Sequence, residues 1–273
     1  MNRIQERFQY NADAGRAALM PFLTAGFPDT ATTEELIRRA DAVGVTAIEI
    51  GFPYSDSIAD GPIIQESFND VLERGGGGVI DTFAMLSRVR GGVGCALIAM
   101  VSYSLVHRFG LDHFMTQAVS AGVDGVIIPD LPVEESKVAG AIIHSAGMCH
   151  IGLVAPTTPP LRREAITKAS SGFIYMIAVS GTTGERQELS ATLAADASWL
   201  REASGLPVCV GFGISSTEHV RSVSAFADGA IVGSAIIRRI AACAEKRVDR
   251  AALVDTVGEF LSSLMSGTAP VAA

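Results

Sequence analysis

Eight short apolar runs alternate along the chain with stretches whose apolar residues recur at helical spacing. The runs are apolar at nearly every position, which is typical of strands buried on both faces of a parallel sheet, whereas half-exposed antiparallel strands alternate apolar and polar residues. The predicted strands cover residues 18–26, 46–52, 95–101, 124–130, 149–155, 172–178, 207–213 and 229–235.

Helical patterns lie between these runs and are clearest at 32–44, 111–122, 133–147 and 217–227. Eight strand–helix units favour a closed barrel over an open doubly wound sheet. An open nucleotide-binding sheet would carry GxGxxG after its first strand, and the chain has AGFPDT there. The sequence therefore predicts an α/β fold, a single (β/α)₈ TIM barrel.

The two ends of the chain have their own patterns. In residues 2–12, Ile4 and Phe8 lie one helical turn apart, so we expect a short extra helix over the N-terminal mouth of the barrel. We assign the barrel domain to residues 1–265. The final residues, SGTAPVAA (266–273), have the composition of a disordered C-terminal tail.

The composition fits one domain and argues against some classes of binding partner. The chain has 273 residues, of which 48% are hydrophobic, enough for one large core. Its net charge is −8 and its basic residues are scattered, which argues against nucleic acid. No apolar run approaches the roughly 20 residues that span a bilayer, and the charged start MNRIQERFQ lacks the apolar stretch of a signal peptide. We expect a cytoplasmic protein without membrane contact, whose four separated cysteines are reduced.

Carboxylates occupy the positions where a TIM barrel carries its chemistry, the C-terminal ends of the strands and the loops after them. Glu49 lies inside the apolar run TAIEIGF, and no predicted strand contains a Lys or Arg to pair with it. Burial would raise its pKa and suit it to transfer a proton near neutral pH. Asp56 and Asp60 follow in the next loop, and Asp130 ends the fourth strand. Asp60 alone is ambiguous, because ADGP is also a turn sequence.

Glycine-rich segments follow the last three strands. They read SGTTG (180–184), GFGIS (211–215) and Gly233-Ser234, the last directly before an apolar helical pattern. Glycines let the backbone approach an anion, and the first N–H groups of a helix bind phosphate without a cationic side chain. The three segments together predict a site for a phosphate ester.

Other catalytic groups are poorly placed. The lysines, Lys137, Lys168 and Lys246, all lie in helical patterns away from the strand ends, so none is positioned to form a Schiff base. The five histidines are dispersed, and the one that touches a strand, His150, is near its N-terminal start. The residues therefore predict carboxylate acid–base chemistry without a metal.

The motifs, in order, are Glu49, PYSDSIADGP (53–62), DLPVEE (130–135), SGTTG (180–184), GFGIS (211–215) and GSA (233–235). In this order and spacing the chain resembles the α subunits of tryptophan synthase along essentially its whole length. The resemblance implies a lyase that cleaves indole-3-glycerol phosphate to indole and glyceraldehyde 3-phosphate by a retro-aldol reaction, in tryptophan biosynthesis.

The resemblance also implies roles for residues. Glu49 would transfer the protons, and Asp60 would bind the indole N–H and stabilise the cationic intermediate. The phosphate would be held by Gly184, Gly213, Gly233 and Ser234, the indole ring by Phe22, Tyr175 and Phe212, and the loop closed by Thr183 with Asp56. The family implies no cofactor in this chain, pyridoxal phosphate in a β-subunit partner, and an αββα heterotetramer.

Two segments depart from the family pattern and keep alternatives open. Ser57 replaces a loop proline, and VSYSLV (101–106) lacks the usual asparagine. Both segments lie toward the β-subunit interface in the family, so a stand-alone indole-releasing lyase is one alternative. A non-catalytic subunit that binds a phosphate ligand is another, although the presence of both Glu49 and Asp60 argues against it. A phosphosugar isomerase would need an Asp or Cys base on the first strand, and ALMPFLTAG has neither.

Overall fold

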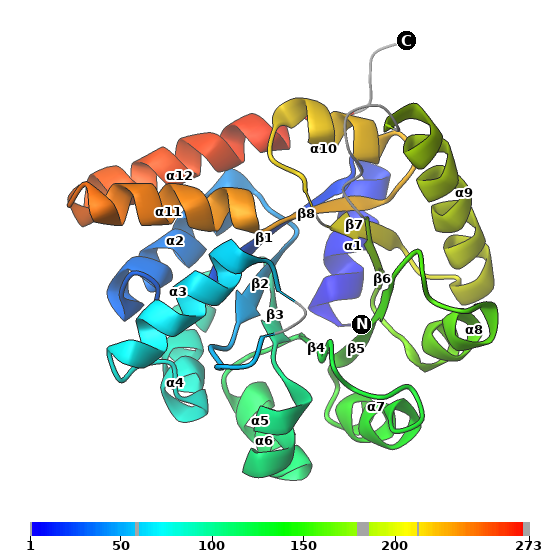
Figure 1. Ribbon diagram of the computed structural model, residues 1–273, viewed down its shortest axis with the longest axis horizontal. Helices are drawn as coiled ribbons and strands as arrows, with labels where there is room; N and C mark the ends of the chain where they lie inside the picture. The colour runs from blue at the N-terminus through cyan, green and yellow to red at the C-terminus, as the bar shows by residue number, and fades with distance from the viewer. Residues whose placement is uncertain (1, 58–59, 179–185, 212, 270–273) are drawn as a thin grey trace.

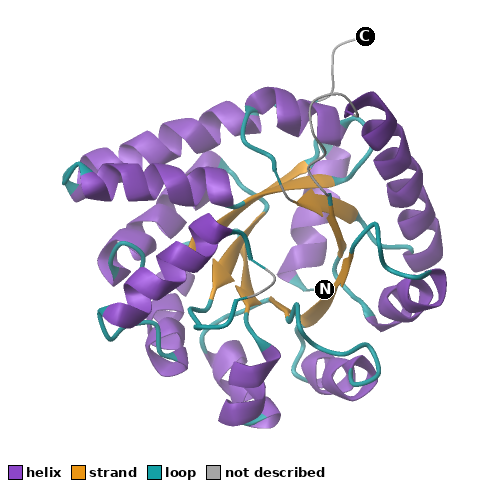
Figure 2. Cartoon of the chain, in the orientation of Figure 1, coloured by secondary structure: helices purple, strands orange, loops and turns teal. Residues whose placement is uncertain are grey.

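The computed structural model describes residues 2–57, 60–178, 186–211 and 213–269, with the backbone alone for 186–191. In these residues the strands form one closed, parallel barrel in the order β1 to β8, with the helices around it (Figures 1 and 2). This confirms the predicted fold. The strands are β1 (Ala18–Thr24), β2 (Ala47–Gly51), β3 (Ala96–Met100), β4 (Gly125–Ile127), β5 (Cys149–Val154), β6 (Ile174–Ile177), β7 (Val208–Gly211) and β8 (Gly229–Val232).

Each predicted apolar run contains one observed strand, which is shorter than the run. The last run, 229–235, ends as a strand at Val232, because Ser234 already begins a helix. The helices are α1 (Arg3–Asp13), α2 (Thr30–Val43), α3 (Pro62–Glu73), α4 (Val79–Arg90), α5 (Tyr103–Phe109), α6 (Leu111–Ser120), α7 (Ser136–Ser145), α8 (Pro160–Ala169), α9 (Arg186–Ser204), α10 (Thr217–Ser224), α11 (Ser234–Glu245) and α12 (Arg250–Met265).

Side chains on each strand alternate between the barrel interior and the surrounding helices. On β2, Ile48 and Ile50 pack in the cluster formed with the helices, whereas Ala47 belongs to the interior cluster with Met20, Ile98 and others. Glu49 lies two residues after Ala47 and opposite Phe22 in the register between β1 and β2. The alternation therefore places the Glu49 side chain in the interior, midway along its strand.

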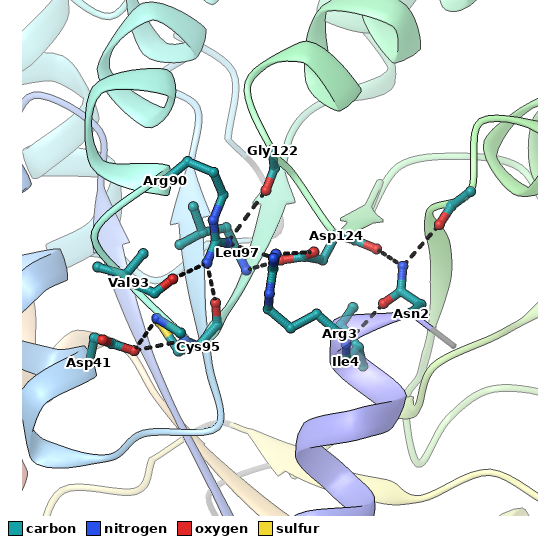
Figure 3. Close-up of polar contacts among 12 residues, drawn as sticks. Asn2, Arg3, Ile4, Asp41, Arg90, Val93, Cys95, Leu97, Gly122 and Asp124 are labelled. Carbon is teal, nitrogen blue, oxygen red and sulfur yellow. Dashed lines mark hydrogen bonds and ion pairs between the residues drawn. The ribbon is translucent and has the colours of Figure 1, made fainter.

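The predicted N-terminal helix is present as α1 and covers the barrel's N-terminal mouth (Figure 1). Its Ile4 and Phe8 are buried in the interior cluster. Polar contacts fix its start (Figure 3): Arg3 Nη1 donates to Asp124 Oδ1 at 2.7 Å, and Asn2 Nδ2 donates to the backbone of Asp124 and of Gly147, at 2.9 Å each. The opposite mouth is not covered by this helix.

Asp124, at the start of β4, joins three elements. Its Oδ2 accepts from Arg90 Nη1 at 3.2 Å and from the backbone N of Leu97 at 2.8 Å, while its Oδ1 accepts from Arg3. The same Arg90 donates to the backbone oxygens of Val93 and Cys95 (Figure 3). This partly buried network holds α1, α4 and the start of β3 together.

The chain continues to pack after α12 ends at Met265. Gly267 and Thr268 are buried, and the Thr268 oxygen accepts from Ala17 N at 3.0 Å, directly before β1. Gly267 and Thr268, within the predicted tail 266–273, thus pack against the folded body, and residues 270–273 lie outside the described residues. No helix in the described part of the chain is long and apolar enough to cross a membrane.

Candidate active site

A cavity of about 280 Å³ opens at the C-terminal ends of the strands. It brings together seven residues predicted from the sequence, which come from five different strands or the loops that follow them. They are Phe22, Glu49, Asp60, Tyr175, Gly213, Gly233 and Ser234.

Glu49 is 3% exposed, and its Oε1 has no hydrogen-bond partner. Burial first, and then the nearby Asp60 carboxylate, raise its pKa from 4.5 to about 8. Taking an unpaired carboxylate out of water is so costly that the proton is retained instead. At neutral pH Glu49 therefore carries a proton that it can give away.

Asp60 is the second carboxyl group in the cavity. Its Oδ2 is also buried without a partner, and burial raises its pKa from 3.8 to about 6. The pKa values of the two carboxyl groups are thus separated, so that near pH 7 Glu49 is mainly protonated and Asp60 mainly ionised. This pair combines a proton donor with an anion in one small apolar space.

A side chain of α3, that of Gln65, holds the loop that carries Asp60. Gln65 Nε2 donates to the backbone oxygens of Ser57, at 2.8 Å, and of Asp60, at 2.9 Å. Pro62 begins the helix, where its missing N–H is not needed. Ser57, which replaces the family's proline, is buried and its backbone is tied by Gln65. Residues 58 and 59 lie outside the described part of the loop.

Glycines in the strands make room for the predicted aromatic residues. A Cβ at Gly51 would lie 2.4 Å from the Phe22 ring, and one at Gly211 would lie 2.4 Å from the Tyr175 hydroxyl. Both distances are far below van der Waals contact. Apolar side chains that the sequence did not single out complete the walls: Ile64, Met100, Leu153, Ile177 and Ile231. A flat aromatic ligand fits such a space.

The other side of the cavity has backbone features that favour an anion. Gly213 has a φ of 73°, in the left-handed region that favours glycine. Gly233 precedes Ser234, the first residue of α11, and no side chain caps this helix start. Its first N–H groups and the helix dipole therefore face the cavity unneutralised. Arg238, four residues later, also lines the cavity, whereas the sequence pattern predicted a phosphate site that needs no cationic side chain.

The remaining predicted site residues are outside the cavity or outside the described residues. Asp56 is exposed and accepts from Ser55 Oγ at 3.2 Å. Gly184, Thr183 and Phe212 lie outside the described residues, so their predicted roles, including the contact between Asp56 and Thr183, stay predictions.

Asp130 stabilises the segment 101–106, which departs from the family pattern. Its two carboxylate oxygens accept from Ser102 Oγ at 2.8 Å and from Tyr103 N at 2.7 Å, at the start of α5. Ser102 also caps this helix by accepting from Ser104 N. Asp130 is therefore engaged at the helix start and does not line the cavity.

A larger cavity, of about 800 Å³, lies near α1 and α10 at the N-terminal side of the barrel. Its one carboxylate among the described lining residues, Asp228, is paired with Arg201 at 3.0 Å. Unpaired carboxyl groups are found in the smaller cavity instead, and the C-terminal ends of the strands are where this fold carries its chemistry. We therefore assign the candidate active site to the smaller cavity.

Comparison with known proteins agrees with this geometry. Residues 8–264 match the family model described as "Tryptophan synthase alpha chain". The chain is 43% identical to the tryptophan synthase alpha chain of Picosynechococcus over 242 residues, covering 88% of this chain and 91% of the relative. It is 41% identical to that of Rhodopirellula baltica over 271 residues, covering 97% and 98%.

Solved structures agree as well. Tryptophan synthase subunit alpha of Legionella pneumophila superposes with a TM-score of 0.88 at 31% identity, over 98% of both chains. A chain of tryptophan synthase from M. tuberculosis in an open form superposes with a TM-score of 0.84 at 30% identity, over 98% of this chain and 99% of that one. With its barrel, its carboxyl pair and this similarity over nearly its full length, the chain belongs to the tryptophan synthase alpha chain family, the lyases that cleave indole-3-glycerol phosphate.

Proposed function

We propose that Glu49 and Asp60 perform the cleavage of indole-3-glycerol phosphate in the cavity described above. The observation that carries the assignment is the Glu49 carboxyl group, which is buried inside the barrel without a partner and faces a second unpaired carboxyl group. A carboxyl group kept only for stability would have a partner, because an unsatisfied buried polar group is destabilising.

In the proposed reaction, Glu49 donates its proton to C3 of the indole ring. The ring becomes an indolenine-like cation, whose N–H is bound by the Asp60 carboxylate. The glycerol hydroxyl then loses its proton to Glu49, its oxygen forms the aldehyde, and the electron pair of the broken C–C bond returns to the ring. Indole and glyceraldehyde 3-phosphate leave, and Glu49 is protonated again.

The ring itself accepts the electrons once C3 is protonated, so the proposed reaction needs neither a metal nor an imine. We propose that this chain uses no cofactor and that pyridoxal phosphate belongs to a β-subunit partner. The three lysines support the absence of an imine, since none lines the cavity among its described residues. Among the described residues, no group of three or more His, Cys, Asp or Glu side chains is placed to hold a metal ion.

The substrate's parts match the two sides of the cavity. The indole ring would lie between Phe22 and Tyr175, near the carboxyl pair. The phosphate would lie at the start of α11, near Gly213, Gly233 and Ser234. We further propose that Gly184 and Phe212 complete these two subsites, and that Thr183 and Asp56 close the loop over them. Cytoplasmic location remains part of this proposal.

Incubating the purified chain with indole-3-glycerol phosphate and measuring indole tests the proposal. Glu49→Gln should abolish release while the chain stays folded, and Asp60→Asn should lower kcat a few hundred-fold, or about 3 kcal/mol. Activity should survive EDTA, and borohydride should trap no adduct. Near-normal turnover by Glu49→Gln would exclude the mechanism, and loss of activity on chelation, restored by zinc, would show that a metal takes part.

A further inference from the structure

One cationic side chain lines the cavity among its described residues, that of Arg238. It follows Ser234 by four residues on α11, one turn along the same helix face. Side chains on a helix lean toward its N-terminus, so the Arg238 guanidinium can reach the helix start where we propose that the phosphate binds.

Arg238 has no ion pair or side-chain hydrogen bond within the described part of the chain. Its neighbour Arg239 differs, because that side chain donates to Ala235 O at 2.9 Å and stacks over the Phe260 ring with its Cζ 3.3 Å from the centroid. Arg90 and Arg163, which are mostly buried, both have carboxylate partners. The structure thus fixes Arg239 in place and leaves the charge of Arg238 available at the cavity.

A surface groove beside α3 offers a competing explanation. Arg238 also borders this groove, together with Glu66 and Asp70. Neither carboxylate lies within 4.0 Å of the Arg238 nitrogens, and Asp70 is already paired with Arg74. A role in holding α11 against α3 would therefore require a rearrangement that binding to the cavity does not.

An added cation matters here because the remainder of the predicted phosphate site consists of backbone groups and one hydroxyl. A helix start contributes only about half a unit of positive charge, whereas a phosphate monoester carries close to two negative charges. The chain as a whole has a net charge of −8, which opposes the approach of such an anion.

We propose that Arg238 completes the phosphate subsite and makes the site select the phosphorylated substrate, an inference that rests on the function proposed above. Its guanidinium supplies the charge that the backbone groups lack, and it acts on binding rather than on proton transfer. Removing it should therefore raise KM and leave kcat nearly unchanged.

The experiment compares Arg238→Gln, Arg238→Lys and Arg38→Gln with the unchanged chain. Arg38 is a matched control, because it is half-exposed on α2, away from the cavity, and its substitution changes the net charge equally. Calorimetry with glycerol 3-phosphate at two salt concentrations gives the affinity of the subsite. Steady-state kinetics with indole-3-glycerol phosphate gives KM and kcat, and thermal unfolding of each variant reports stability.

For Arg238→Gln we expect Kd and KM to rise about tenfold, kcat to stay within about twofold, and the salt dependence of Kd to become shallower. Arg238→Lys should recover most of the affinity, and Arg38→Gln should behave like the unchanged chain. An unchanged Kd in Arg238→Gln overturns the proposal, as does a loss of thermal stability with no change in Kd, which would indicate a structural contact with α3. If the unchanged chain binds glycerol 3-phosphate but releases no indole, the proposed function is wrong. The Kd values of the Arg238 variants then still test whether Arg238 binds the phosphate.

Discussion

Glu49 is held where its charge is poorly tolerated. The barrel interior surrounds it, and the other carboxyl group in the cavity repels its ionised form. Such a position reduces stability and holds a proton at the proposed reacting centre, a combination that is common at catalytic sites. Two predictions follow from the pKa values of this pair.

The first is a pH-dependent gain in stability when Glu49 is neutralised. Its pKa is about 8 in the folded chain against 4.5 ordinarily, so the folded state binds this proton more tightly than the unfolded state. Stability is then lost as the pH rises from about 4.5 to about 8, and the loss persists above that. Glu49→Gln should remove it, so urea unfolding should show a gain that grows across this window to a few kcal/mol. The exposed Glu73→Gln is the control, and a gain independent of pH would contradict the argument.

The second prediction concerns activity. The competent form has Asp60 ionised and Glu49 protonated, and their pKa values are about 6 and about 8. We expect kcat/KM to be bell-shaped in pH, falling below about 6 and above about 8. In Asp60→Asn the acidic limb should disappear from the residual activity, while the alkaline limb remains. A profile of Asp60→Asn that keeps both limbs would remove Asp60 from the assignment.

At the scale of elements, the two mouths of the barrel serve different purposes. The C-terminal mouth carries two carboxyl groups with buried, unpaired oxygens, whereas the N-terminal mouth is covered by α1, whose start is held by the hydrogen-bonded network around Asp124 (Figure 3). In this fold the first arrangement is typical of catalysis and the second of stability. The network around Asp124 can therefore be changed without touching the candidate active site.

We predict that Asp124→Ala destabilises the chain by roughly 3 kcal/mol, because the substitution leaves the largely covered Arg90 without its carboxylate and leaves the buried N–H of Leu97 on β3 without an acceptor. Chemical denaturation measures the loss. Asp70→Ala is the matched control, since its pair with Arg74 is half-exposed and should contribute less than about 1 kcal/mol. At a temperature where Asp124→Ala is fully folded, its KM should be normal. Equal losses in the two variants would show that the network is not cooperative.

At the scale of the whole molecule, the sequence has features that point both toward and away from a β-subunit partner. The family implies a β subunit, whereas Ser57 and the 101–106 segment depart from the family pattern near its expected interface. In the structure both departures are accommodated: Gln65 ties the Ser57 backbone, and Asp130 ties the start of α5. The surface that would meet a partner is thus altered in sequence but locally well anchored.

We propose an αββα assembly and predict that adding a tryptophan synthase β subunit raises indole release about tenfold, equivalent to about 1.4 kcal/mol of coupling. The gain would come from tighter binding of the β subunit to the closed form of the Asp60 loop. Gel filtration and kcat, measured for the chain alone and for the mixture, check this. Full activity alone, with no change and no co-elution, would establish the stand-alone lyase instead.

The sequence by itself determined the order of the elements. Apolar runs such as CALIAMV and DGVIIPD predict buried parallel strands because a strand covered on both faces needs apolar residues throughout. The sequence also identified Glu49, because a charged residue is rare in such an apolar run. It identified Gly233-Ser234, because a glycine directly before an apolar helical pattern indicates a helix start with free N–H groups. Both depend only on neighbours along the chain.

Only the tertiary structure decided which of these residues meet. Residues as far apart in the sequence as Phe22 and Ser234 line one cavity because the barrel closes β8 onto β1. The sequence did not indicate Arg238, because its role depends on which face of α11 meets the cavity. Asp130 was a candidate catalytic carboxylate by its position at a strand end, but in the structure its carboxylate accepts hydrogen bonds at the start of α5. The packing of Gly267 and Thr268 was equally hidden, since burial there comes from contacts with distant segments near Ala17 and Thr217. Local pattern fixes the type of each element, whereas partners, burial and pKa values arise from contacts between segments that the pattern does not contain.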